Sequence, residues 1–180
     1  MSTSPTSTRP LLHCCETWKV LASRGEVLAN RPEQPETWAA MEAMDRFLLR
    51  PLEDRYGVVT LTYGFAGREL VKAVEKRASA ENRLPNITPS ADQHAGHELN
   101  TRGNRICKRD GFAVDLRVPG QSSLEVIDWI VENLPFDRIY FYDAQRPFHL
   151  SWAPEPKGQV VQMIETDSGR LIPRVRRRGR

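Results

Sequence analysis

The sequence lacks the features that would place the chain in a membrane or direct it out of the cell. No run approaches the ~20 apolar residues that a membrane-spanning helix needs. The first ten residues are rich in Ser, Thr and Pro and have no apolar segment behind a basic start, so we expect no secretory signal in them. The three cysteines are an odd number, and the adjacent pair Cys14 and Cys15 is of a kind that seldom forms a normal disulfide. We therefore expect a reduced, cytoplasmic protein with no membrane partner.

The sequence also lacks a strong charge of either sign. The formal net charge is only +3 in 180 residues, and five arginines crowd the last seven positions. The body of the chain is thus close to neutral, which argues against a nucleic-acid-binding surface over the whole domain. No aromatic residue stands between the terminal arginines to stack on bases, so we expect a solvated tail that binds nucleic acid or an acidic partner weakly at most.

What remains is the composition of one ordinary globular domain. Hydrophobic residues make up 39% of the chain and charged residues 27%, which leaves enough apolar material for a core. No internal repeat is visible. We predict a flexible N-terminus over residues 1–10, a single domain over 11–173 and a basic C-terminal tail over 174–180.

The hydrophobic pattern predicts helices first and most of the strands later. Pro51 is expected to end or kink the second helix, and Ser122 to Glu125 form a capping-box signature for the last one. We expect helices near 13–21 and over 36–49, 68–79 and 122–133, and strands over 58–63, 112–118, 138–142, 147–152, 159–164 and 170–175. This order predicts an α+β fold of N-terminal helices plus a small antiparallel sheet.

The candidate functional residues lie in and after a long irregular stretch. Residues 81–110 are polar with no clear period, and such a segment inside a compact domain is usually functional or mobile. It carries His94 and His97, which are either metal ligands or ordinary surface histidines. Cys107 near its end is a candidate thiolate ligand or a small buried residue.

Two later strands supply the other candidate ligands. Asp115 lies on the non-core face of the alternating strand 112–118, and a carboxylate inside so apolar a strand requires a partner. His149 lies between Phe148 and Leu150, where it is a metal ligand or a hydrogen-bonded structural histidine. Catalytic zinc takes three protein ligands and leaves a fourth position for water, so we predict one zinc per chain on Asp115, His149 and one of His94 and His97, with His94 preferred.

These residues occur in an order that resembles the D-Ala-D-Ala carboxypeptidase-like zinc metallopeptidases, a family with the hedgehog/DD-peptidase fold. The similarity spans about residues 36–152 and rests on a strand ending in Tyr-Gly-Phe, on Gly111-Phe-Ala-Val-Asp115 and on a late Phe-His-Leu-Ser. The resemblance implies zinc held by His, Asp and His, a glutamate as general base and an arginine that grips the substrate carboxylate. Asp115 and His149 match two of the ligands, and Arg68 is a loose match for the arginine.

The sequence departs from the family pattern at two positions. Lys108 stands where the family has its first histidine, so His94 takes that role only if residues 95–108 are an insertion; His97 and Cys107 are the reserve ligands. Arg146 stands where the family has its glutamate, and the nearest candidates for a replacement base are Asp143 and Glu98.

Two functions follow from the pattern. The resemblance implies a zinc-dependent peptidase or amidase that acts on peptidoglycan-type or other small peptides. Peptidoglycan lies outside the cytoplasm, so a cell-wall substrate would require release by lysis, as for a phage endolysin. The alternative is a catalytically degenerate binding module, in which Lys108 and Arg146 have replaced the catalytic histidine and glutamate.

Overall fold

A computed structural model describes residues 9–12, 15–25, 28–83, 88, 90–166 and 171–176. The predictions for residues 1–8, for the start of the first helix at 13–14, for residue 170 at the start of the last strand and for residues 177–180 of the tail lie outside this part of the chain. None of the helices within it is both long enough and apolar enough to cross a membrane.

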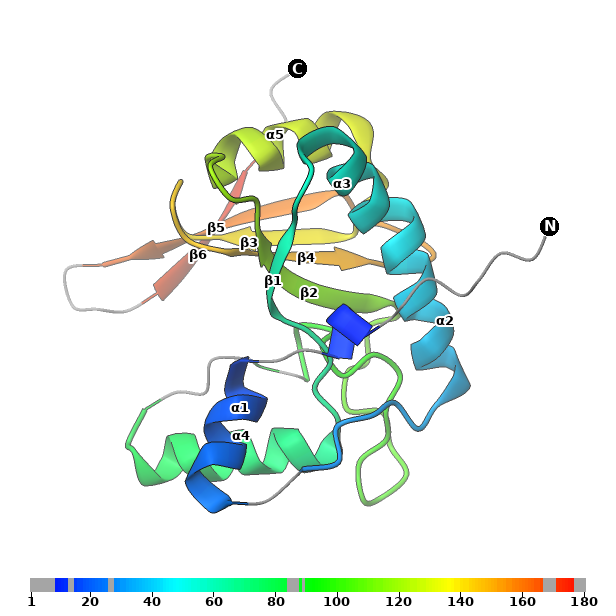
Figure 1. Cartoon of the computed structure of the whole chain (residues 1–180), viewed down its shortest axis with the longest axis vertical. Coiled ribbons are helices and arrows are strands. Elements are labelled where there is room, and N and C mark those ends of the chain that lie inside the picture. Colours follow the sequence, from blue (N-terminus) through cyan, green and yellow to red (C-terminus); the bar gives the residue numbers. More distant parts are fainter. Residues whose placement is uncertain are drawn as a thin grey trace.

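The helices form two groups (Figure 1). α1 (Cys15–Arg24) and α4 (Arg68–Ala80) lie below the sheet and share a small apolar cluster. α2 (Pro35–Met44), α3 (Arg50–Tyr56) and α5 (Ser123–Asn133) pack against the sheet and close the main core. A short 3-10 helix, Arg9–Leu12, precedes them.

The second predicted helix is longer than the sequence indicated. A π-helical turn, Asp45–Leu49, joins α2 directly to α3, so the helix continues to Tyr56 and Pro51 does not end it. Proline in a helix clashes with the carbonyl four residues earlier, and a widened turn just before it relieves that clash. The helix ends instead at Gly57, whose φ of +80° suits glycine.

Six strands form one mixed sheet. They are β1 (Thr60–Tyr63), β2 (Phe112–Arg117), β3 (Arg138–Phe141), β4 (Phe148–Trp152), β5 (Gln159–Glu165) and β6 (Leu171–Arg176), in the order β1-β2-β4-β3-β5-β6. The α+β class is confirmed. The sheet is larger than the small antiparallel sheet predicted, and its β3–β5 pair is parallel.

The parallel pair follows from the hydrogen bonding of β4. Both edges of β4 are occupied, by β2 and by β3, so β5 pairs with the remaining edge of β3. The connection over 153–158 therefore wraps around the start of β3, where the amides of Gly158 and Gln159 donate to the carbonyls of Phe136 and Asp137. The last strand, β6, confirms the strand predicted over 170–175 and extends to Arg176, so it includes the first residues of the predicted basic tail.

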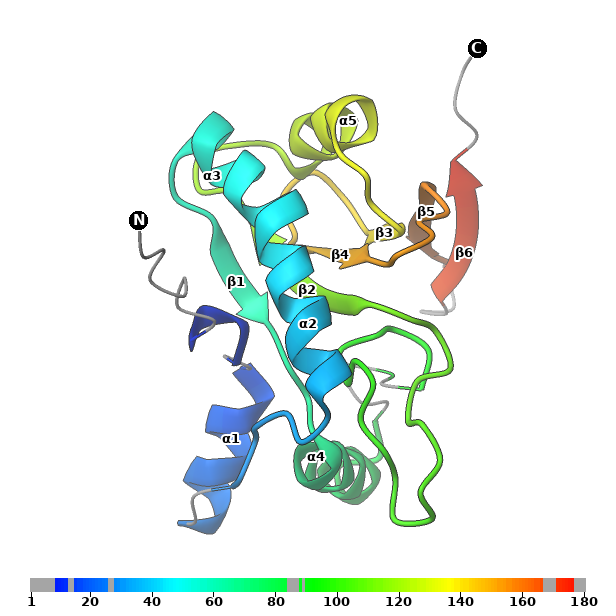
Figure 2. The same cartoon turned by 90° about the vertical axis from the view of Figure 1, so that its right-hand side faces the viewer.

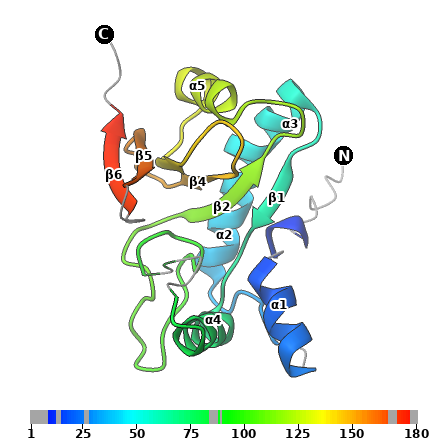
Figure 3. The same cartoon turned by 90° about the vertical axis from the view of Figure 1, so that its left-hand side faces the viewer.

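The two faces of the sheet have different neighbours. Phe112, Val114 and Leu116 of β2 lie in the main core, on the face that α2 and α3 cross in Figure 2. The alternate residue Asp115 lies on the opposite face, as the strand pattern predicted. Figure 3 shows that this second face is met by the irregular segment between α4 and β2 rather than by a long helix.

The sequence correctly predicts where α5 begins, but not the hydrogen bonds that form there. Ser122 is the N-cap residue, yet its side chain makes no capping hydrogen bond. The neighbouring Ser123 instead donates from Oγ to the carbonyl of Arg146, which ties α5 to the turn between β3 and β4.

Gly111 leads the chain into β2 at a point where a side chain has no room. Its φ is +95°, and a Cβ there would lie 1.8 Å from the carbonyl oxygen of Trp152 on β4. We expect Gly111→Ala to lower the free energy of unfolding by about 3 kcal/mol, measured by urea denaturation. Gly120→Ala is the matched control, because Gly120 has a similar φ of +77° with open space around it. Equal losses in the two variants would refute the steric account.

Candidate metal centre

Three side chains from separate elements meet on the open face of the sheet: His94, Asp115 and His149. The antiparallel pairing of β2 with β4 sets Asp115 directly opposite His149. His94 comes from the irregular segment, which is joined to the end of β1 by a hydrogen bond from the amide of Ala66 to the carbonyl of His94. The register of the sheet and this hydrogen bond bring together residues that are far apart in the sequence.

The spacing of these groups suits a metal ion. Nε2 of His94 lies 3.3 Å from Oδ1 of Asp115, and Nδ1 of His149 lies 3.1 Å from the same oxygen. The three ligand atoms all lie within 4.8 Å of one another. Bonds of 2.0–2.1 Å in a tetrahedral zinc site separate the ligand atoms by about 3.3 Å. The cluster could therefore bind a metal ion with little rearrangement.

His94 is held in the orientation that a metal ligand needs. Its ring is 1% exposed and packs edge-on against Tyr63, with 5.2 Å between the ring centroids. Nδ1 lies 2.9 Å from the carbonyl oxygen of Gly64, which can only accept a hydrogen bond, so Nδ1 carries the proton. Nε2 is thereby left free to bind a metal, and such backbone support is typical of histidine ligands.

His149 has an unused nitrogen. Its ring is 8% exposed and lies 5.3 Å from the ring of Tyr140 and 5.1 Å from that of His94, centroid to centroid. Nδ1 faces Asp115, whereas Nε2 is buried and has no hydrogen-bond partner in the part of the chain that the structure describes. Nδ1 is the nitrogen at ligand spacing from Asp115, so it is the atom of this ring that would bind the metal.

The charges of His94 and Asp115 are strongly coupled. Burial by itself would lower the pKa of His94, but the carboxylates of Asp115 and Asp92 raise it to about 9. Burial raises the pKa of Asp115, and the charges and hydrogen bonds of His94 and His149 outweigh it and hold that pKa well below its usual range. Without a metal, the centre is an ion pair between a protonated His94 and an ionised Asp115. A metal ion that binds there must displace the His94 proton.

The two reserve ligands do not join this cluster of described side chains. His97 is half-buried, and its Nε2 accepts a hydrogen bond from the amide of Gly111; burial lowers its pKa. Cys107 is a fully buried free thiol. Lys108, at the position of the family's first histidine, is exposed and does not line the pocket at the cluster.

The two predicted bases have other structural contacts. Glu98 accepts hydrogen bonds from the amides of Glu33 and Gln34 and from the hydroxyl of Thr37, all at the start of α2. Asp143 is exposed in the turn between β3 and β4. The amides of the two turn residues 145 and 146 donate to it, and these hydrogen bonds lower its pKa.

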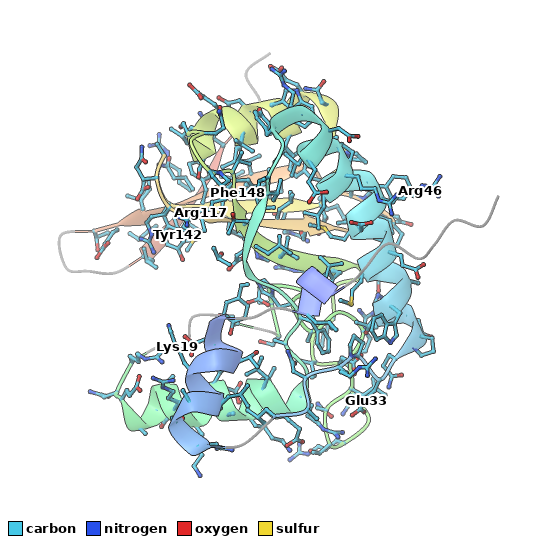
Figure 4. All side chains as sticks on the ribbon, viewed as in Figure 1. Lys19, Glu33, Arg46, Arg117, Tyr142 and Phe148 are labelled. Carbon is cyan, nitrogen blue, oxygen red and sulfur yellow. The ribbon has the colours of Figure 1, made fainter. Side chains whose placement is uncertain are left out.

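Arg68, the predicted carboxylate-binding arginine, lies at the first residue of α4. Its guanidinium is 3.7 Å from Glu33 and 3.6 Å from Glu69. In Figure 4, Glu33 lies low in the molecule, well away from Tyr142, which lines the pocket beside the metal cluster. The structure thus does not bring Arg68 to the candidate centre.

A pocket of about 390 Å³ opens at the cluster and contains residues that the sequence interpretation missed. Besides the three candidate ligands it is lined by Asp92, Arg109 and Tyr140, among others. Arg109 donates from Nη1 to the carbonyl of Ala91 and to the hydroxyl of Tyr140. Asp92 stands only two residues before His94, and this proximity in the sequence could have identified it as a residue of the site. Nothing in the sequence distinguishes Arg109 from its basic neighbours.

Comparisons of the chain with models of protein families, with curated proteins and with solved structures found no match. The functional interpretation therefore depends on the site itself.

Proposed function

We propose that the chain is a zinc-dependent peptidase or amidase, a divergent member of the D-Ala-D-Ala carboxypeptidase-like metallopeptidases with a hedgehog/DD-peptidase-like fold. The observation that carries the proposal is the convergence of His94, Asp115 and His149 at zinc-ligand spacing in an open pocket. In this account residues 95–108 are an insertion, and His94 takes the place that Lys108 leaves vacant in the family pattern.

The donor set favours zinc over the common hard cations. Two imidazoles and one carboxylate are a typical ligand set for catalytic zinc, whereas Mg²⁺ and Ca²⁺ prefer oxygen ligands throughout. Asp115 keeps 26% of its side chain exposed, so the centre can be reached from the pocket. Zinc in such a site lowers the pKa of water to about 7 and polarises a carbonyl group.

Two further side chains supply the remaining roles in amide hydrolysis. Asp92 is the carboxylate that lines the pocket alongside Asp115. Its Oδ1 accepts only a long hydrogen bond, 3.3 Å, from the His94 amide, so this oxygen can accept a proton from water and pass it to the leaving amine. Arg109 presents a guanidinium to the same pocket, where it can orient a substrate oxygen.

The test is hydrolysis of short peptides, including ones that end in D-Ala-D-Ala, by the zinc-loaded full chain. We expect zinc-dependent cleavage, and we expect Asp92→Asn to lower kcat about 100-fold while the zinc content is unchanged. Asp128→Asn on α5 is the control for loss of an exposed carboxylate. Wild-type activity in Asp92→Asn would exclude Asp92 as the base. A zinc-loaded chain that cleaves no peptide would favour the binding-module alternative.

A further inference from the structure

A second pocket, of about 310 Å³, adjoins the metal pocket and shares Arg109 with it. We call it the basic pocket, since four of the residues that line it are Lys108, Arg109, Arg138 and Lys157. Its walls come from the segment before β2, the start of β3 and the connection over 153–158. The crossover that makes β3 and β5 parallel thus also builds this pocket.

The acidic residues of the basic pocket are largely neutralised by other contacts. Asp137 is 2% exposed and accepts hydrogen bonds from Nη1 of Arg138 at 2.7 Å and from the amide of Lys157 at 3.0 Å. Asp110 forms an ion pair with Arg105 at 2.6 Å, which lowers the pKa of its carboxyl group. Glu155 is the remaining acid of the lining.

The cationic side chains of the basic pocket still have N–H groups that can donate hydrogen bonds to a ligand. Lys108 and Lys157 are exposed, and neither ammonium group has an ion-pair or hydrogen-bond partner among the residues that the structure describes. The contacts of Arg109 are to a carbonyl and a hydroxyl, so its charge is not neutralised by a carboxylate. The pocket therefore has an excess of positive charge and donors that point to an oxyanion as its ligand.

We propose that the basic pocket binds a side-chain carboxylate of the substrate whose amide lies at the metal centre, so that the preferred substrates are acidic peptides. This inference rests on the proposed function, because it assigns the substrate class of the same site. Arg109, which lines both pockets, is the positioning residue between the reacting amide and the carboxylate.

The experiment measures fluorescence anisotropy of two labelled tetrapeptides with amidated C-termini, one with two glutamates and one with two glutamines in their place. We expect the full chain to bind the glutamate peptide about tenfold more tightly at low salt. This preference should shrink as the salt concentration rises from about 0.05 M to about 0.5 M. The double variant Lys108→Gln/Lys157→Gln should lose the preference, and Lys72→Gln/Lys76→Gln on α4 should keep it.

Equal affinity for the two peptides, or a preference that survives in Lys108→Gln/Lys157→Gln, would overturn the inference. Zinc content and peptide cleavage are measured on the same samples, so the peptidase proposal and the basic-pocket proposal can be refuted independently. A glutamate preference without cleavage contradicts only the peptidase proposal. Cleavage of both peptides with equal kcat/KM contradicts only the assignment of the basic pocket.

Discussion

Asp115→Asn is expected to weaken zinc binding by at least about 100-fold. The side chain keeps its size, but it loses the negative charge that lies within 3.3 Å of both histidines. A neutral amide is a poorer zinc ligand than a carboxylate, and its NH₂ group can face an imidazole nitrogen that should bind the metal. Isothermal titration of the metal-free protein with zinc measures the change directly.

The control for Asp115→Asn is Asp128→Asn, which removes an exposed carboxylate from α5 and should leave zinc affinity unchanged. Circular dichroism establishes that both variants are folded. If Asp115→Asn binds zinc as tightly as the wild type, the metal lies elsewhere in the chain and the proposed centre is wrong.

Glu98→Ala is expected to lower the free energy of unfolding by about 4 kcal/mol, because hydrogen bonds to a buried charged group are strong and its removal leaves their donors unpaired. Glu98 is 3% exposed and accepts hydrogen bonds from three donors, the amides of Glu33 and Gln34 and Thr37 Oγ1, at 2.8–3.2 Å. The N-cap residue Gln34 makes no side-chain capping bond of its own, so Glu98 caps α2 from a distant part of the chain.

Urea denaturation measures this loss, with Glu42→Ala on the exposed face of α2 as the matched control. We expect the control to change the free energy of unfolding by no more than about 0.5 kcal/mol. A normally stable Glu98→Ala that has lost only catalytic activity would contradict this structural role and restore Glu98 as a candidate base.

Local pattern was sufficient to predict most of the elements. The alternation of residues 112–118 gave both the strand and the face on which Asp115 lies. The hairpin between β3 and β4 was visible because a turn separates two β-rich runs. The helix that continues through Pro51 was missed because the π-helical turn before it depends on packing, which no local pattern records.

Sheet topology and the candidate site depended on contacts between distant residues. The parallel β3–β5 pair results from the occupied edges of β4, which a list of strands does not reveal. His94, Asp115 and His149 were identified from residue type and the family resemblance. By contrast, Arg68, Glu98 and Asp143 were chosen because they stand near expected positions along the chain, and the fold gives each of them other partners.

The most direct test of the metal centre is elemental analysis of the full chain, purified without chelators, beside the folded variant His149→Ala. The account predicts about one zinc per wild-type chain, as expected for a single centre with three protein ligands, and little or none in His149→Ala. A wild-type chain without bound metal, or a variant that keeps its zinc, would contradict it.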